Sequence, residues 1–267
     1  MNRDLNTKVS VIMPVYNGES FLNESVQSIL NQTFKNFQFI IINDGSTDKT
    51  LRILKKFKRN DKRIILIDNK KNMGASKSFN IGLKRAKGKY VACFCADDIS
   101  HPKRLEAEFN YLERNPCIFL VGTSGIYINE RGKEIRRFRK YNNYKLLAWR
   151  LRKSCSILFP SIMFRNMPDD EKIYLDDNFS PADDYNLYFE LIKKGKSLTN
   201  LSPFLVKVRI HPGGMSSYKN KRQEELRMQI LKKFNELKDN TNIFDKIYFS
   251  ALLLIHHLKT RNEKKVR

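Results

Sequence analysis

The chain has 267 residues, of which 41% are hydrophobic, so it can bury one substantial core as a globular protein. It holds 51 Lys and Arg against 28 Asp and Glu, and the formal net charge of +23 attracts nucleic acids, anionic membranes or phosphorylated ligands without choosing among them. No run of 18 or more apolar residues is present, which argues against a signal sequence or a membrane-spanning helix.

The first hundred residues alternate between strand and helix patterns. Short β-branched and aromatic runs that end in turn residues predict strands, and apolar residues on one helical face predict the helices between them. The expected strands are 9–17, 37–46, 63–68 and 89–95, and the expected helices lie around 22–30, at 46–60 with Ser46 as the cap, and at 74–88. This alternation predicts an α/β, Rossmann-like fold with a mostly parallel sheet and helices on both faces.

After residue 100 the alternation loosens, and a basic stretch spans 131–153. We expect a helix at 103–115, strands at 118–129, near 161–164 and at 204–212, a helix at 183–195, and a helical, basic segment from Tyr218 onward. These features predict one main domain, residues 1–217, with halves at 1–100 and 101–217, followed by a C-terminal extension at 218–267.

The four cysteines, at positions 93, 95, 117 and 155, show no paired metal spacing. Cys93 and Cys95 lie two apart within an expected strand, which suits packing rather than a disulfide. We therefore expect the chain in a reducing compartment, the cytoplasm.

Asp97 and Asp98 stand side by side at the end of an apolar strand. Ligands of parallel α/β sheets bind beyond the carboxyl ends of the strands. Two neighbouring carboxylates repel each other unless a cation shares the site, and such oxygen ligands suit Mg²⁺ or Mn²⁺, which take further oxygens from a diphosphate. An exposed turn, with Asp98 or Ser100 capping the helix near Pro102, explains the pair equally well.

Other polar residues also occupy element ends. Asp44 follows a strand, where its carboxylate can accept hydrogen bonds from a base N–H or a ribose. Asp183 and Asp184 begin a helix, where one acid suits the helix dipole and the second suits a general base toward a sugar or alcohol hydroxyl. His211 ends a strand before a Gly-Gly turn and is either a packing residue or a partner of a diphosphate or an ion.

Six motifs, in one order, resemble those of the family 2 inverting glycosyltransferases with the GT-A fold. They are VSVIMPVYNGESFLNESVQSILNQTF, FQFIIINDGSTDKT, NMGASKSFNIGLKRAKGKYV, CADDISHPKRL, ADDYNLYFEL and RIHPGGMSS, within about residues 8–217. The resemblance implies a nucleotide-diphosphate-sugar donor, with UDP as the expected nucleotide, held by residues 1–100, and an acceptor held by residues 101–217. It further implies a bacterial-type sugar transferase of polysaccharide, lipopolysaccharide or capsule biosynthesis.

The resemblance also implies roles for the donor-side residues by matching position. Asp44 would contact the base, and Pro14 and Tyr16 would border the nucleotide. Asp97 and Asp98 would be the pair that binds the ribose and a Mn²⁺ or Mg²⁺ ion.

On the acceptor side, the resemblance implies that Asp184, next to Asp183, is the catalytic base and that His211 lies near the diphosphate or the metal. Members often carry a third acid where this chain has Cys95, and Glu-Asp where it has two aspartates. The first departure leaves open which acid of the pair at 97 and 98 binds the ion, and the second leaves open whether Asp184 or Asp183 is the base. Attack by the acceptor oxygen opposite the nucleotide inverts the anomeric configuration.

Two other classes of protein also fit parts of the sequence. A nucleotidyltransferase also uses a metal and a diphosphate on such a sheet, although PVYNGES lacks the Gly-rich phosphate loop that is usual there. A nucleic-acid-binding protein fits the charge, but neither a zinc-finger spacing nor an aromatic RNA-recognition signature accompanies it. The apolar run within IFDKIYFSALLLIHHLKTRNEKKVR suits either a helix lying at the inner face of the cell membrane or one docked on the core.

Overall fold

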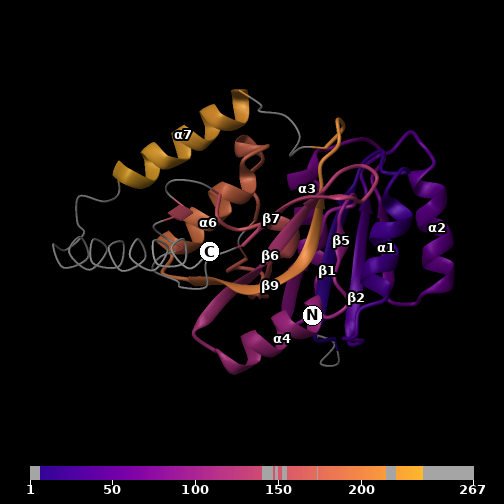
Figure 1. Ribbon diagram of the computed structural model, residues 1–267, viewed down its shortest axis with the longest axis horizontal. Helices are drawn as coiled ribbons and strands as arrows, with labels where there is room; N and C mark the ends of the chain where they lie inside the picture. The colour runs from indigo at the N-terminus through magenta and orange to yellow at the C-terminus, as the bar shows by residue number, and fades with distance from the viewer. Residues whose placement is uncertain are drawn as a thin grey trace, which may run out of the picture.

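The computed structural model describes residues 7–139, 147, 150, 151, 155–172, 174–214 and 221–236. Within these residues the strands form one nine-stranded sheet, in the order β3-β2-β1-β4-β8-β6-β9-β5 with β7 paired to β6 (Figure 1). The fold is α/β, as the alternation of patterns predicts.

The first half of the sheet is wholly parallel. β1 pairs with β2 and β4, and β2 pairs with β3, each in parallel. The elements are β1 (Val9–Val15), α1 (Leu22–Leu30), β2 (Phe37–Asn43), α2 (Thr50–Asn60), β3 (Ile64–Asp68), α3 (Ala75–Arg85) and β4 (Tyr90–Cys93). The predicted alternation of strands and helices before residue 100 is confirmed.

The second half of the sheet is mixed. β6 runs parallel to β9, whereas β8 is antiparallel to both β4 and β6, and β5 is antiparallel to β9. The elements are β5 (Ile99–Ser100), α4 (Arg104–Arg114), β6 (Ile118–Ile128), β7 (Glu134–Phe138), η1 (Phe159–Ser161), β8 (Met163–Arg165), η2 (Asp177–Phe179), α6 (Asp183–Lys193), β9 (Ser197–Arg209) and α7 (Lys221–Glu236).

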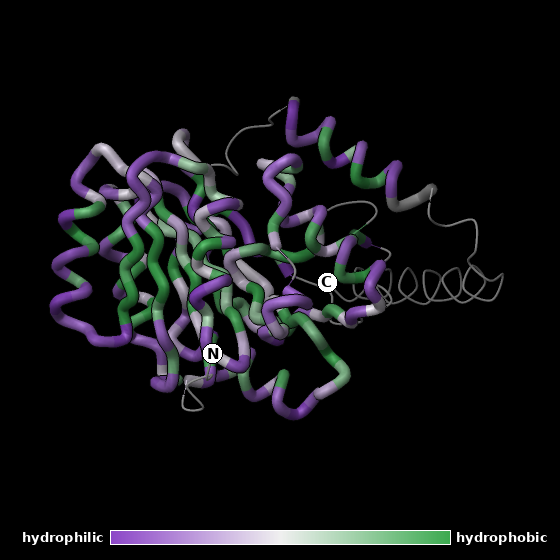
Figure 2. Tube along the Cα trace, turned by 180° about the vertical axis from the view of Figure 1, so that it is seen from behind, coloured by the Kyte–Doolittle hydropathy of each residue, from purple (hydrophilic) through white to green (hydrophobic). Residues whose placement is uncertain are grey.

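Alternate strand residues build two cores, one on each face of the sheet. One core combines Ile12, Ile40 and Ile42 with apolar residues of α3 and α6. The other core combines the adjacent strand residues Val11, Met13, Phe39 and Ile41 with apolar residues of α1, α2 and α4. Figure 2 shows hydrophobic segments along the central strands and hydrophilic ones along the outer loops. Successive side chains of a strand point to opposite faces of the sheet. These largely apolar strands therefore require helices on both faces.

Several expectations about the elements need correction. β9 begins at Ser197 rather than at residue 204, and the short strands β5 and β7 have no counterpart among the predicted elements. Ser46 does not cap a helix, because α2 begins at Thr50 and the Ser46 hydroxyl accepts a hydrogen bond from the backbone N–H of Asn17. The Asp48 carboxylate accepts the N–H of Thr50 instead.

The predicted helical tail is confirmed where α7 is described. The interfacial helix expected in residues 243–267 lies outside the described residues, as do 140–146, 148, 149 and 152–154 of the basic stretch. Among the described residues, no helix is both long and apolar enough to cross a membrane.

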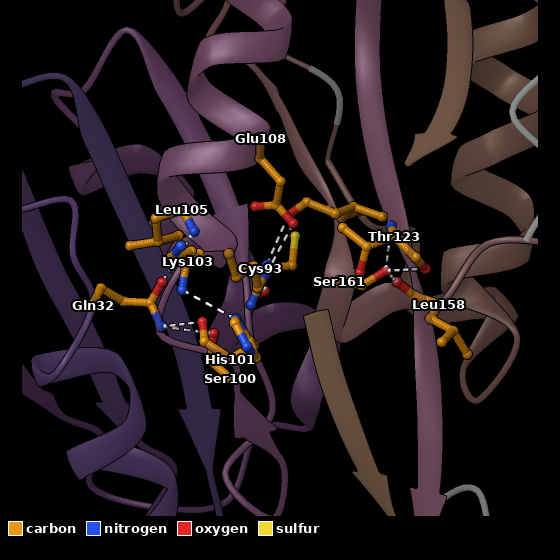
Figure 3. Close-up of polar contacts among 12 residues, drawn as sticks. Gln32, Cys93, Ser100, His101, Lys103, Leu105, Glu108, Thr123, Leu158 and Ser161 are labelled. Atoms are coloured by element: carbon orange, nitrogen blue, oxygen red, sulfur yellow. Dashed lines mark hydrogen bonds and ion pairs between the residues drawn. The ribbon is translucent and has the colours of Figure 1, made fainter. Parts of the chain in front are cut away.

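The segment after β4 crosses to the far edge of β9 and is fixed there by Gln32. The Gln32 side-chain amide donates to the Ser100 hydroxyl at 3.1 Å and to the His101 carbonyl at 2.8 Å (Figure 3). The Gln32 carbonyl oxygen accepts the N–H of Leu105 at 3.0 Å. These contacts hold the chain at β5 and at the start of α4, immediately after the acidic pair at 97 and 98.

Candidate active site

The carboxyl ends of β1, β2 and β4 meet at one edge of the sheet, as parallel strands require. Pro14 lies within β1, half-buried and in register with Ile42 of β2. Tyr16 follows β1 with 48% of its surface exposed. An exposed ring at this edge can pack against a planar ligand, and the nucleotide-bordering role of Pro14 and Tyr16 stays a prediction.

The turns after β1 and β2 are hydrogen-bonded to each other. Asn17 adopts a positive φ of 47° and accepts the N–H of Thr47 at 2.9 Å through its side-chain oxygen. Gly45 has a φ of 68°, and a Cβ placed there would lie 2.5 Å from the backbone carbon of Lys71. The Gly45 turn therefore needs glycine both for its backbone conformation and for its close approach to the chain after β3.

Asp44 is buried, and its carboxylate holds the segment that connects β3 to α3. One oxygen accepts hydrogen bonds from the Asn69 amide at 2.9 Å and the Met73 N–H at 3.0 Å. The other oxygen accepts the Gly74 N–H at 2.9 Å. Asp44 thus fixes the segment 69–74 at this end of the sheet. The position of Asp44 after β2 alone did not reveal this structural role.

The two acids after β4 differ in their surroundings. The Asp98 carboxylate is buried and accepts the backbone N–H of Arg209 at 2.9 Å. The N–H groups at the start of α4 bind His101 and Gln32, so the alternative that Asp98 or Ser100 caps this helix is wrong. Burial raises the pKa of Asp98 well above its ordinary range, and the charge of Asp97 raises it further. The Asp97 side chain keeps 31% exposure, and its Oδ2 lies 3.1 Å from His211 Nε2. His211 therefore belongs to the acidic site rather than to the core.

These side chains offer a donor set that fits a divalent cation. One donor atom each from Cys95, Asp97 and Asp98 lies within 4.8 Å of the others, and the imidazole of His211 adjoins Asp97. Carboxylate oxygens suit Mg²⁺ and Mn²⁺, and an imidazole is a common ligand of transition metals. A dication also offsets the repulsion between the two adjacent carboxylates.

The second acidic pair begins α6, as predicted, and its two members make different contacts. Asp183 accepts a hydrogen bond from the Ser76 hydroxyl at 2.7 Å, and burial raises the pKa of its carboxyl. Asp184 Oδ2 lies 3.9 Å from the Cys155 sulfur, whose thiol donates to it. The exposure of both acids is intermediate.

The second acidic pair affects the electrostatics of the first site. Burial raises the pKa of the Cys95 thiol well above its ordinary range, and the charges of the neighbouring pair and of Asp184 raise it further. Asp184 therefore lies within electrostatic reach of the residues that fit a cation. A second connection runs from Asp44 through the Gly74 N–H to α3, where Ser76 contacts the start of α6.

Sequence patterns did not single out several residues of this site. Ser76, Cys155 and Arg209 act through partners far away in the chain. The only local signal was the two-residue spacing of Arg209 and His211 within the expected strand 204–212, which predicts that both side chains point to one face.

A parallel sheet with an acidic pair beyond β4, followed by a mixed half that carries a second acidic pair, defines a GT-A glycosyltransferase. The solved structure of S. aureus TarS residues 1–349 in complex with UDP-GlcNAc shares this fold, with a TM-score of 0.72 and 21% identity over 90% of this chain and 69% of that one. Mannosyltransferase PcManGT from Pyrobaculum calidifontis, in complex with GDP-Man and Mn²⁺, gives a TM-score of 0.67 with 15% identity, over 90% of this chain and 67% of that one.

The family model described as glycosyl transferase family 2 matches residues 10–173. An uncharacterized glycosyltransferase of Haemophilus influenzae is 34% identical, over 96% of this chain and 82% of that protein. The chain therefore belongs to glycosyltransferase family 2 and is an enzyme of that class. This membership confirms the resemblance that the six motifs carry, and it sets aside the nucleotidyltransferase and nucleic-acid-binding alternatives.

Proposed function

We propose that this glycosyltransferase transfers a sugar from a nucleoside-diphosphate sugar to a hydroxyl group of a glycan or lipid-linked saccharide, with inversion at the anomeric carbon. The observation that carries the proposal is the cluster of Cys95, Asp97 and Asp98 beyond the carboxyl end of β4, with His211 Nε2 3.1 Å from Asp97. UDP is our expected nucleotide. The bound UDP-GlcNAc of TarS and the GDP-Man of PcManGT show that the fold accommodates such donors in other proteins.

The nucleotide would lie at the ends of β1 and β2, bordered by Pro14 and Tyr16. Asp44 already fixes the wall at residues 73 and 74. Among the described residues, its Oδ2 accepts a hydrogen bond from the Gly74 N–H alone, and a carboxylate oxygen has two acceptor positions. This oxygen thus keeps the capacity to accept an N–H from the base.

A Mn²⁺ or Mg²⁺ ion would be held by Asp97 and His211, with Asp98 as the buried acid behind them. Asp97 is the more exposed of the two acids, and the Asp98 Oδ1 already accepts the N–H of Arg209. Asp98 therefore has one oxygen left for an ion. When bound, such an ion stabilises the negative charge that develops on the departing diphosphate.

Asp184 would act as the general base. Its carboxylate takes the proton of the acceptor hydroxyl as that oxygen forms a bond to the anomeric carbon. The bond from the anomeric carbon to the diphosphate oxygen breaks, and its electron pair leaves with the nucleotide. Attack opposite the leaving group inverts the configuration and requires no covalent intermediate. Asp183, bound to Ser76, fixes the helix start that presents the base.

The biological setting is a further part of the proposal. We place the enzyme in cell-envelope polysaccharide biosynthesis, in the cytoplasm and peripheral to the inner face of the membrane. The exposed Arg136 and Arg137 of β7 support attraction to an anionic surface. The division at residues 100 and 217 likewise remains a prediction.

A binding and turnover screen tests this function. Calorimetry with UDP-sugars and GDP-sugars, with Mn²⁺ or with EDTA, should reveal at least one donor whose binding requires the metal. The same donor should release its nucleoside diphosphate when a glycan acceptor is supplied. Failure of every nucleotide sugar to bind in the presence of Mn²⁺ would refute the proposal.

A further inference from the structure

Arg209, the last residue of β9, is a buried cation next to the proposed metal site. Only 3% of the surface of Arg209 is exposed to solvent. Its Nε donates to the backbone carbonyl of Asp97 at 2.9 Å, and its Nη1 donates to the carbonyls of Asn129 at 3.2 Å and Glu130 at 2.8 Å. Its Nη2 donates to the carboxylate of Glu24 in α1. One guanidinium therefore joins β9 to three other segments.

The backbone of Arg209 binds the second acid of the pair. Its N–H donates to Asp98 Oδ1 at 2.9 Å. Together with the bond from Nε to the Asp97 carbonyl, this contact ties both acids to the end of β9. The positions of both acids therefore depend on where Arg209 lies.

Phe21 links Arg209 to His211. The Arg209 Cζ lies 4.6 Å from the centroid of the Phe21 ring, and the centroids of Phe21 and His211 are 4.8 Å apart. A guanidinium over an aromatic face is a favourable cation–π contact. The ring thus restrains the imidazole whose Nε2 adjoins Asp97.

The pairing of charges in this cluster leaves Asp97 available for a ligand. A buried cation needs a counter-ion, and Arg209 finds it in Glu24, whose side chain is 57% exposed. Toward Asp97, the guanidinium donates to the backbone carbonyl, not to the carboxylate. The Asp97 carboxylate is therefore held in place without being neutralised by the arginine that holds it.

We infer that Arg209 is a positioning residue, which, through Asp97, Asp98 and the Phe21 contact, sets the metal ligands before donor and ion bind. This inference rests on the proposed function. Lysine cannot replace arginine here, because one ammonium group cannot reach acceptors that a planar fork with five donors serves at once. Residues that orient metal ligands typically change metal affinity by about 10-fold to 100-fold when they are replaced.

Arg165 provides a matched control. Its guanidinium also donates to backbone carbonyls, those of Ile118, Leu112 and Asn115, and to the Tyr90 hydroxyl. Arg165 lies beside the first residue of β4, whereas the acidic pair follows the last. Arg165→Lys therefore measures the cost of removing a comparable arginine remote from the site.

The experiment measures Mn²⁺ affinity by electron paramagnetic resonance in the presence of UDP, and in parallel GDP, together with thermal unfolding. We expect Arg209→Lys to weaken Mn²⁺ binding at least about 10-fold. Arg165→Lys should lower the melting temperature and leave the Mn²⁺ affinity unchanged. Glu24→Ala, which removes an exposed side chain, should weaken Mn²⁺ binding less than Arg209→Lys does. Glu24→Ala decides the question if Arg209→Lys fails to fold.

The possible outcomes separate the two claims. A wild-type protein that binds no Mn²⁺ with either nucleotide would overturn the proposed function and this inference together. A wild-type protein that binds Mn²⁺, with Arg209→Lys binding equally well, would overturn the inference alone. Equal weakening by Arg165→Lys would also overturn it, because the effect would then reflect general destabilisation. If Arg209→Lys does not fold, unchanged Mn²⁺ affinity in a folded Glu24→Ala protein would overturn the inference.

Discussion

The Ser76 hydroxyl donates a hydrogen bond of 2.7 Å to the Asp183 carboxylate, although 107 positions separate the two residues. It joins the first turn of α3, which lies against the proposed nucleotide site, to the first turn of α6, which carries the proposed base. The two neighbouring acids of α6 thereby acquire different tasks. Asp183 fixes the helix start, and Asp184 is the base that we propose.

Replacing each acid separately should reveal this difference. Asp184→Asn should keep donor binding and lower the transfer rate by about 10²-fold to 10⁴-fold, because an amide cannot accept the proton. Asp183→Asn should keep more activity and lower the melting temperature, because the Ser76 bond loses its charged acceptor. The two variants are compared by calorimetry with the donor and by nucleotide release. Wild-type turnover in Asp184→Asn would exclude this residue as the base.

Substitutions of the adjacent acids Asp97 and Asp98 should also have different effects on metal binding and stability. Asp97→Ala should abolish metal-dependent donor binding with little loss of stability, because the side chain is partly exposed and faces His211. Asp98→Ala should lower the free energy of unfolding by about 1 to 3 kcal/mol, because the buried Arg209 N–H loses its acceptor, and should weaken metal binding as well. Urea unfolding and Mn²⁺ titration measure the two effects. A stable, metal-binding Asp97→Ala protein would contradict the assignment.

Asp44→Asn should affect both stability and nucleotide binding. The buried carboxylate accepts three hydrogen bonds, two of them from backbone N–H groups at 73 and 74. An amide must turn its NH₂ group toward one of these donors, so we expect a loss of about 1 to 3 kcal/mol and weaker donor binding. Glu134→Gln removes an exposed ion pair with Arg137 and serves as the control, with a stability expected to stay close to that of wild type. Equal stabilities of the two variants would contradict the role of Asp44.

The Arg104–Glu108 pair should make stability depend on pH. Both side chains are fully buried, Arg104 Nε lies 2.9 Å from Glu108 Oε1, and burial raises the pKa of Glu108 from 4.5 to about 7. Between these values the native chain holds a proton that the unfolded chain has released. Rising pH therefore favours unfolding, by about 3 kcal/mol at most over this window.

Urea unfolding of wild type and Glu108→Gln at intervals across that pH window isolates this effect. The stability of wild type relative to the variant should fall as pH rises, since the amide does not titrate. A difference that stays constant, or one that grows in favour of wild type, would show that Glu108 is ionised throughout the window.

The sequence is informative where structure follows local periodicity. Short, mostly apolar runs such as Phe37–Asn43 predict buried strands, so the alternation before residue 100 and the placing of Asp44 and Asp97 at strand ends follow from the sequence pattern. The motif resemblance then supplies Asp184. Ser46 was misassigned because its capping pattern is local, whereas its actual partner, Asn17, comes from another turn. The early start of β9 was missed because Pro203 interrupts the pattern within a strand that continues through it.

Local sequence patterns do not predict contacts between residues that lie far apart in the chain. Arg209 and Glu24 are 185 positions apart, and nothing in either local sequence indicates that they meet. The same holds for Cys155 beside Asp184 and for Ser76 beside Asp183. These residues become recognisable as parts of the site only when the sheet order brings β9, β4 and α6 to one edge.

A crystal structure with a bound nucleoside-diphosphate sugar and Mn²⁺ tests the central claim most directly. The anomalous signal of manganese should lie between the Asp97 carboxylate and the His211 imidazole, with the diphosphate completing the coordination and the Asp184 carboxylate facing the anomeric carbon. Manganese located elsewhere, or a donor lodged away from the ends of β1, β2 and β4, would contradict the account.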